Sequence, residues 1–205
     1  MIADRTLERF SNDGARGVIA EVREIDRDIA AGFQRDPEQF TDVHDRYFRD
    51  IYRYVAGRLD VQVAEDIAAE TFCLAFGQRD RFDPQRGSLR AWLFGIATNL
   101  VAQYRRKEAR RYKALARTGA DPAVGSHEDR VLTEVTAWRL RPQLAKALTT
   151  LSPGERDVVL LVALAELTYD EVADALGISQ GTVGSRLSRA RKKLHKVIRP
   201  EAFHG

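Results

Sequence analysis

Residues 168–194 read TYDEVADALGISQGTVGSRLSRARKKL, and this stretch decides the fold. Thr168 and Glu171 have the spacing of a capping box, which starts a helix by pairing two side chains with backbone N–H groups. Gly177 is the residue type that most often ends a helix, and a second helix is predicted from about residue 180. Two helices joined by a short glycine turn predict a helix-turn-helix, which places its second helix in the major groove of DNA.

The second helix of this motif has a basic face. Residues 186–199 contain seven Lys or Arg and no Asp or Glu. On a helix in the major groove, N-terminal side chains reach base edges while flanking cations hold phosphates. The alternative that the pattern leaves open is a solvated amphipathic helix that is merely basic. The side chains predicted to contact DNA are Thr182, Ser185, Arg186, Arg189, Arg191, Lys192 and Lys193.

The helical pattern continues on the N-terminal side of this motif. Ser152, Pro153 and Glu155 form a strong helix start: serine caps, proline fits the first turn and glutamate closes a capping box. Three leucines spaced four residues apart predict one more helix before it. We therefore expect a helical block over residues 137–199, followed by a tail over 200–205.

A linker divides the chain into two blocks. Residues 116–136 are turn-forming and charged without an apolar period, and such a stretch is uncommon inside one compact domain. We expect a first block of three helices over 37–115, with Ser88 capping the third. Residues 1–36 form an N-terminal extension of unknown role, with a helix expected over about 17–30. Because the linker is polar and contains glycine and proline, the two blocks are expected to move relative to each other.

The first block contains a polar loop followed by a helix with a basic end. The loop covers residues 79–87, and residues 105–117 carry seven Lys or Arg against one Glu. Phe82, Trp92 and Tyr104 are interleaved with these cations. Cationic grooves with aromatic pockets hold single-stranded nucleic acid, and a loop can form the pocket for a flipped base. The alternatives are that Trp92 belongs to the core and that the basic end is solvated and favoured by the helix dipole.

The second predicted helix of this block has an acidic face, formed by Glu65, Asp66 and Glu70 with Asp60 nearby. Paired carboxylates are used in acid–base and metal chemistry. No histidine lies at ligand spacing from them, so we predict no metal site and no catalytic residue. A solvated acidic face is the simplest interpretation, and a docking face for a basic partner is the more specific one.

The composition excludes several classes of protein. The chain has 205 residues, 44% apolar and 31% charged, with a net charge of +3. The single cysteine, Cys73, allows neither an intramolecular disulfide nor a cysteine-based zinc site, which fits a reducing compartment. The longest apolar run, Val158 to Ala165, is too short to cross a membrane, and no secretory signal is recognisable. No phosphate-binding loop or nucleophile elbow is present, and no cofactor is predicted.

Two sets of residues resemble the extracytoplasmic-function (ECF) branch of bacterial sigma factors. Residues 66–72 (DIAAETF), 87–93 (GSLRAWL) and 96–99 (IATN) look like sigma region 2. Residues 151–156 (LSPGER) and 181–191 (GTVGSRLSRAR) look like sigma region 4. The order of the two sets and the short gap between them match this branch, because larger sigma factors carry a further helical domain there.

The resemblance implies an all-α fold of two small helical domains, a region 2 bundle and a region 4 helix-turn-helix, joined by a flexible linker. It implies a promoter-specificity subunit of RNA polymerase that acts in the cytoplasm and has no catalysis of its own. The last helix would read the −35 element. The −10 element would be recognised and melted by Arg81, Phe82, Asp83, Arg86, Asn99, Arg105 and Arg106.

The resemblance also implies partners. Asp66 and Glu70 would dock on the clamp helices of the largest polymerase subunit, and the flap region of the polymerase would be a further contact. Promoter DNA is the second partner, and an anti-sigma factor that masks these surfaces is the third. The linker would thread near the RNA exit path. Gly184 departs from the family pattern, in which a basic or larger polar residue is common, so the −35 preference stays open.

Two rival functions remain. A helix-turn-helix regulator would bind duplex DNA tightly without polymerase, but it would have no use for the loop and basic helix of the first block. A small helical hydrolase would use Asp66 and Glu70, but it would lack a histidine, cysteine or further carboxylate at a ligand spacing.

Overall fold

The computed structural model describes residues 36–117 and 142–198, together with Ile29 and Gly32. The described part is helical and contains no strand, so the predicted all-α fold is confirmed. The predicted helix over 17–30, apart from Ile29, lies outside the described residues, as do most of the predicted linker and the tail. The helices are α3 (Phe40–Ala56), α4 (Val61–Gly77), α5 (Leu89–Arg117), α7 (Pro142–Thr149), α8 (Pro153–Ala163), α9 (Tyr169–Leu176) and α10 (Gln180–Ile198), with the short 3-10 helices η1 (Pro37–Gln39) and η2 (Arg79–Arg81).

Helices α3, α4 and α5 form the first bundle. Asp60 caps α4 by accepting a 3.0 Å hydrogen bond from the backbone of Val63. Ile51, Tyr54 and Phe94 are fully buried where the three helices meet. The Tyr54 hydroxyl is hydrogen-bonded to Thr98 at 2.7 Å, and its burial raises its pKa, so the ring stays neutral. The three helices predicted for this block therefore share one buried core.

Helices α7 to α10 form the second unit. Both predicted capping boxes are present: the Ser152 backbone donates to Glu155 at 2.9 Å, and the Thr168 backbone donates to Glu171 at 3.0 Å. Gly177 ends α9 with φ of 62°, a left-handed conformation that favours glycine. Helices α9 and α10 are thus the predicted helix-turn-helix, and they bury Val172, Ala173, Val183 and Leu187 in the shared core.

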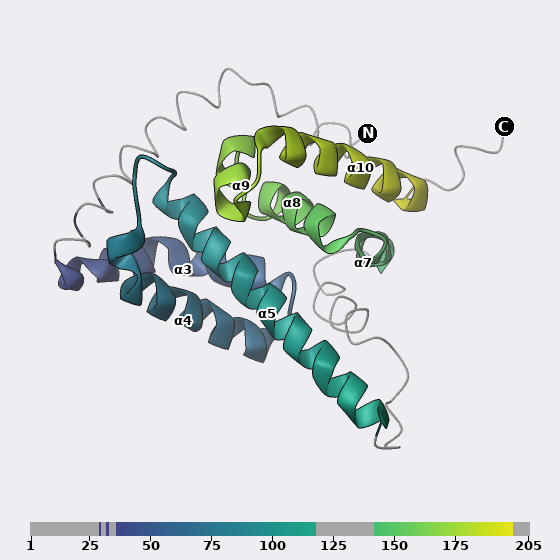
Figure 1. The fold of residues 1–205 in the computed structure, drawn as a ribbon, viewed down its shortest axis with the longest axis horizontal. Coiled ribbons are helices and arrows are strands. Elements are labelled where there is room, and N and C mark those ends of the chain that lie inside the picture. Colours follow the sequence, from purple (N-terminus) through teal and green to yellow (C-terminus); the bar gives the residue numbers. More distant parts are fainter. Residues whose placement is uncertain (1–28, 30–31, 33–35, 118–141, 199–205) are drawn as a thin grey trace.

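The two units pack against each other through α5 and α9, which lie side by side in Figure 1. The Arg58 guanidinium forms a buried ion pair with Asp157 of α8. Ser88 donates a 3.1 Å hydrogen bond to Glu171. A Cβ on Gly95 would lie 2.7 Å from the Ala175 carbonyl oxygen, so only glycine permits this approach of the two helices.

The two units are packed together in the arrangement described here, and their independent motion stays a prediction. Beside the apolar core that both units share, polar groups, a helix-capping serine and a glycine contribute to this contact, and none of these adds to an apolar period. Arg90 adds a hydrogen bond to the Ala165 carbonyl. From the sequence alone, residues that form a buried contact of this kind cannot be distinguished from residues on an exposed surface.

Candidate nucleic-acid interface

Helix α10 has a packed face and an open face. Val183, Leu187 and Ala190 are buried against the rest of the second unit. In Figure 1, α10 lies along the edge of the molecule away from α3 and α4. An exposed helix fits the major groove, so this placement supports the use that the sequence predicts for α10.

The first turn of α10 is ordered by hydroxyl groups. The Ser179 hydroxyl accepts a 3.2 Å hydrogen bond from the Thr182 backbone and lies 2.9 Å from the Thr182 hydroxyl. Ser185 is exposed and donates a 3.1 Å hydrogen bond to the Thr182 carbonyl. The Ser185 oxygen therefore remains available as an acceptor at the end of the helix that is predicted to meet base edges.

Four basic side chains of α10 fall into two groups, while Arg186 is half-buried beside Gly154. Arg191 and Lys192 are exposed and form no ion pair with any residue described here. Arg189 and Lys193 instead lie 3.6 and 2.7 Å from the carboxylate of Glu155. The Lys193 hydrogen bond, together with the Ser152 backbone, lowers the pKa of Glu155 to about 2.

In the loop before α5, the ring of Phe82 packs against the ring of Trp92 from α5. Phe82 is buried and its ring centre lies 5.2 Å from that of Trp92. The Asp83 carboxylate accepts a 2.9 Å hydrogen bond from the Gln85 backbone. The predicted core position of Trp92 is half right, because the ring is partly buried and also lines a cavity of about 420 Å³.

One wall of this cavity comes from the helix-turn-helix. Arg81 and Arg86 line the cavity from the loop. Asp174, Gly177 and Ile178 line it from α9 and the turn that follows. The unit predicted to hold duplex DNA therefore lines one side of the pocket beside the loop predicted to hold single-stranded DNA, while Arg81, Asp83 and Arg86 of the loop stay exposed.

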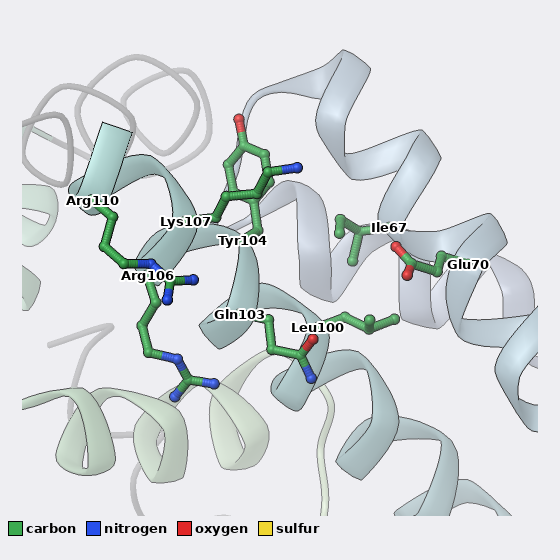
Figure 2. Close-up of a pocket in the computed structure, with 8 residues that line it drawn as sticks. All are labelled: Ile67, Glu70, Leu100, Gln103, Tyr104, Arg106, Lys107 and Arg110. Carbon is green, nitrogen blue, oxygen red and sulfur yellow. The ribbon is translucent and has the colours of Figure 1, made fainter. Parts of the chain in front are cut away.

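A second hollow, of about 380 Å³, lies between α4 and α5. Figure 2 shows Ile67 and Glu70 reaching it from α4, while Arg106 and Arg110 line it from α5. Tyr104 and Lys107 lie between these two groups. Glu70, which is predicted to dock on polymerase, and Arg106, which is predicted to bind DNA, therefore line the same groove.

The other predicted residues of the first unit lie near this groove without lining it. Asp66 and Asn99 are exposed on α4 and α5. Arg105 donates a 3.0 Å hydrogen bond to the Arg58 carbonyl and so supports the turn after α3. Among the described residues, no cluster of His, Cys, Asp and Glu could hold a metal ion. None of the described helices has the length and apolar character needed to span a membrane.

Two features of the site were missed in the sequence. The first is the tertiary role of Glu155, which was identified only as a helix cap. Its spacing from the start of α8 predicts the cap, but no spacing links it to Arg189 and Lys193. The second is the wall that α9 adds to the pocket beside the loop, which depends on the contact between α5 and α9.

Comparison with known proteins finds two family matches in the order that the resemblance implies. The family described as Sigma-70 region 2 matches residues 30–111, and Sigma-70, region 4 matches residues 141–194. The ECF RNA polymerase sigma factor SigW of Bacillus subtilis (strain 168) is 33% identical over 171 residues, covering 80% of this chain and 91% of SigW. The ECF RNA polymerase sigma factor SigC of Mycobacterium tuberculosis is 32% identical over 157 residues, covering 77% of this chain and 82% of SigC.

Two solved structures have a similar fold. The structure of CnrH in complex with the cytosolic domain of CnrY matches with a TM-score of 0.62 and 27% identity, covering 86% of this chain and 99% of CnrH. The sigma factor RpoE of Bartonella quintana, crystallised with the anti-sigma factor NepR, matches with a TM-score of 0.60 and 24% identity, covering 80% of this chain and 99% of that chain.

Proposed function

Because the chain belongs to the ECF RNA polymerase sigma factors, and is thus a sigma subunit that acts in transcription initiation, we propose how its surfaces divide the work of promoter recognition. Helix α10 reads the −35 element as duplex DNA. The loop before α5 and the basic end of α5 read and melt the −10 element. The acidic face of α4 docks on the polymerase.

The observation that carries the assignment of α10 is its two-faced packing. The buried face fixes the helix on α8 and α9, while Ser185, Arg191 and Lys192 remain exposed. Arg186 and Arg189 are the best candidates for base contacts, since arginine can bond guanine with two parallel hydrogen bonds. Thr182, Arg191, Lys192 and Lys193 then serve phosphates or the edge of the groove.

The −10 element is assigned to the loop and the exposed part of α5. Arg81, Asp83 and Arg86 are exposed around the cavity, and Asn99 and Arg106 are exposed along α5. A flipped base needs a pocket with an aromatic wall, and Phe82 and Trp92 supply such a wall. Arg105 already donates a hydrogen bond to the backbone carbonyl of Arg58, so it belongs to this surface while held by that contact.

Contact with the polymerase is assigned to Asp66 and Glu70. Both carboxylates are exposed on α4, and no described residue forms an ion pair with either. Docking on the clamp helices of the largest subunit would use this charge, while the flap region would meet the second unit. A protein that makes these contacts would act in the bacterial cytoplasm, where the polymerase acts.

An anti-sigma factor is the remaining partner in this proposal. Both solved relatives described above are complexes, one with a protein named as an anti-sigma factor. A protein that holds the α5–α9 contact closed would keep the pocket beside the −10 loop in its present shape. Release of that protein would then free the loop and the basic end of α5 for the −10 element.

The experiment is transcription in vitro with bacterial core polymerase and a library of promoter fragments. Initiation that depends on this protein, lost with Arg186→Ala only on −35-dependent promoters, supports the proposal. Charge reversal of Asp66 and Glu70 to Arg should reduce retention of the protein on core polymerase. Tight duplex binding by the protein alone, without initiation, would instead favour a helix-turn-helix regulator.

A further inference from the structure

The first turn of α8 lies against the basic flank of α10. Glu155, the third residue of α8, has a side chain that is only 6% exposed. One carboxylate oxygen accepts a 2.7 Å hydrogen bond from Lys193, and the other lies 3.6 Å from Nε of Arg189. One buried anion therefore restrains two of the seven side chains that we assign to DNA.

The geometry leaves part of Arg189 available. The ion pair uses the Nε edge of the guanidinium, and the side chain is 61% exposed. A guanidinium held by one edge keeps its terminal N–H groups for a second partner. The flexible arginine chain loses rotamer freedom in this contact before DNA arrives, which lowers the entropy lost on binding.

The same contact acts differently on Lys193. Its ammonium is a compact charge, and the short hydrogen bond to Glu155 offsets that charge. Lys192, the neighbouring residue, is exposed and forms no ion pair with a residue in the described part of the chain. Two adjacent lysines on one helix therefore differ in how much charge they offer to phosphates.

The helix cap alone does not require these ion pairs. Glu171 occupies the same third position in α9 and closes an identical capping box with Thr168. Its carboxylate accepts a hydrogen bond from Ser88, the residue that caps α5. The two glutamates thus share one local role and differ in their tertiary partners.

We propose that Glu155 is a positioning residue for −35 recognition, which orients Arg189 toward base edges and restrains Lys193 from nonspecific phosphate contact. The inference rests on the proposed function of α10. It assigns sequence discrimination at −35 to a residue of α8 that itself touches no DNA.

The test uses holoenzyme assembled from core polymerase and the full chain. Promoter duplexes selected by the unmutated holoenzyme from a randomised −35 library are compared with duplexes scrambled at −35. Glu155→Gln keeps the size and the capping ability of the side chain but removes its charge. We expect the preference for the selected −35 to fall about five- to tenfold, as for the loss of one good base contact.

Salt dependence gives a second readout that a structural role would not change. Each cation that neutralises a duplex phosphate adds about 0.9 to the slope of log affinity against log salt. Glu155→Gln should steepen this slope because Lys193 is freed. Lys193→Met should flatten the slope by less than Lys192→Met, a comparison that leaves Glu155 in place. Equal flattening by the two lysine variants would contradict the restraint of Lys193.

Two controls separate the possible failures. Glu171→Gln removes the matched glutamate and should leave the −35 preference at its original value. Arg189→Ala should lower the preference, and adding Glu155→Gln to it should cause no further loss. If Arg189→Ala lowers the preference while Glu155→Gln does not, the inference about Glu155 is wrong and the proposed function stands. If Arg186→Ala and Arg189→Ala both keep the preference, α10 does not read −35, and the inference and the proposed function both fail.

Discussion

The two surfaces assigned to DNA differ in how the fold presents them. Helix α10 presents Arg191 and Lys192 to solvent, whereas Phe82 of the loop is buried and the pocket beside the loop is lined on one side by α9. The helix that carries the open surface could be predicted, since its residues follow a helical period. The wall that α9 adds to the pocket could not, because it comes from a contact between units far apart in the sequence.

This difference has a consequence for recognition at a promoter. The open helix can meet duplex DNA in the arrangement seen here. The pocket beside the loop is lined on one side by α9 and the turn after it, so the contact between α5 and α9 sets its present shape. The contact between α5 and α9 therefore bears on recognition of −10 and not of −35. The variants proposed next change this contact or one of the two DNA surfaces.

The largest effect is expected from Arg58→Ala. The Arg58 side chain is only 3% exposed and forms an ion pair with Asp157. Removing one partner of a buried pair typically costs about 3–5 kcal/mol, and the partial exposure of Asp157 favours the lower end. Urea unfolding of the full chain measures this loss of unfolding free energy.

Two variants test the cause of that loss. Arg58→Met combined with Asp157→Leu should recover most of the stability, since apolar replacement of a buried pair is often neutral. Arg53→Ala breaks the exposed 3.4 Å pair with Asp50 and should cost at most about 1 kcal/mol. Equal losses for Arg58→Ala and Arg53→Ala would mean that the buried pair does not form in solution.

The next effect is expected from Gly95→Ala. The added Cβ would lie 2.7 Å from the Ala175 carbonyl oxygen, so α9 must move. Overpacking of this kind costs about 1–3 kcal/mol. With Trp138 changed to Phe, acrylamide quenching of Trp92 reports the loop, and we expect quenching to increase.

The matched control is Gly77→Ala at the end of α4. A Cβ at Gly77 meets no atom within 4 Å, so quenching of Trp92 should not change. An unchanged signal in Gly95→Ala as well would show that α9 does not line the pocket beside the loop in solution.

What could be predicted from the sequence divides in the same way, between local features and contacts of residues far apart in the chain. Helices, caps and the glycine turn depend on neighbours within about four residues, so Ser152, Thr168 and Gly177 could be placed from the sequence. The buried pair of Arg58 and Asp157 joins residues 99 positions apart. Charged residues are common on surfaces, so a lone arginine in the sequence gives no sign that it is buried.

A smaller effect concerns acid stability. The hydrogen bond from Lys193 lowers the pKa of Glu155 from 4.5 to about 2. A carboxyl group with a lowered folded pKa stabilises the fold above its unfolded pKa and loses that contribution as the pH falls. The contribution of Glu155 is therefore complete above about pH 4.5 and is lost between pH 4.5 and 2. Acid unfolding of Glu155→Gln should lack this part of the pH dependence, whereas identical acid curves would contradict the shift.

The smallest effect is expected on the open surface itself, from Gly184→Ala. Glycine inside a helix is less favourable than alanine by up to about 1 kcal/mol, and a Cβ at Gly184 meets nothing within 4 Å. Gly184→Ala should therefore raise the unfolding free energy by up to about that amount while the −35 preference is kept. Gly184→Arg should add a phosphate contact and steepen the salt slope by about 0.9, since the side chain enters open space beside the groove. Loss of stability in both variants would show that this flank of α10 is packed, and α10 would then resemble the partly buried loop rather than differ from it.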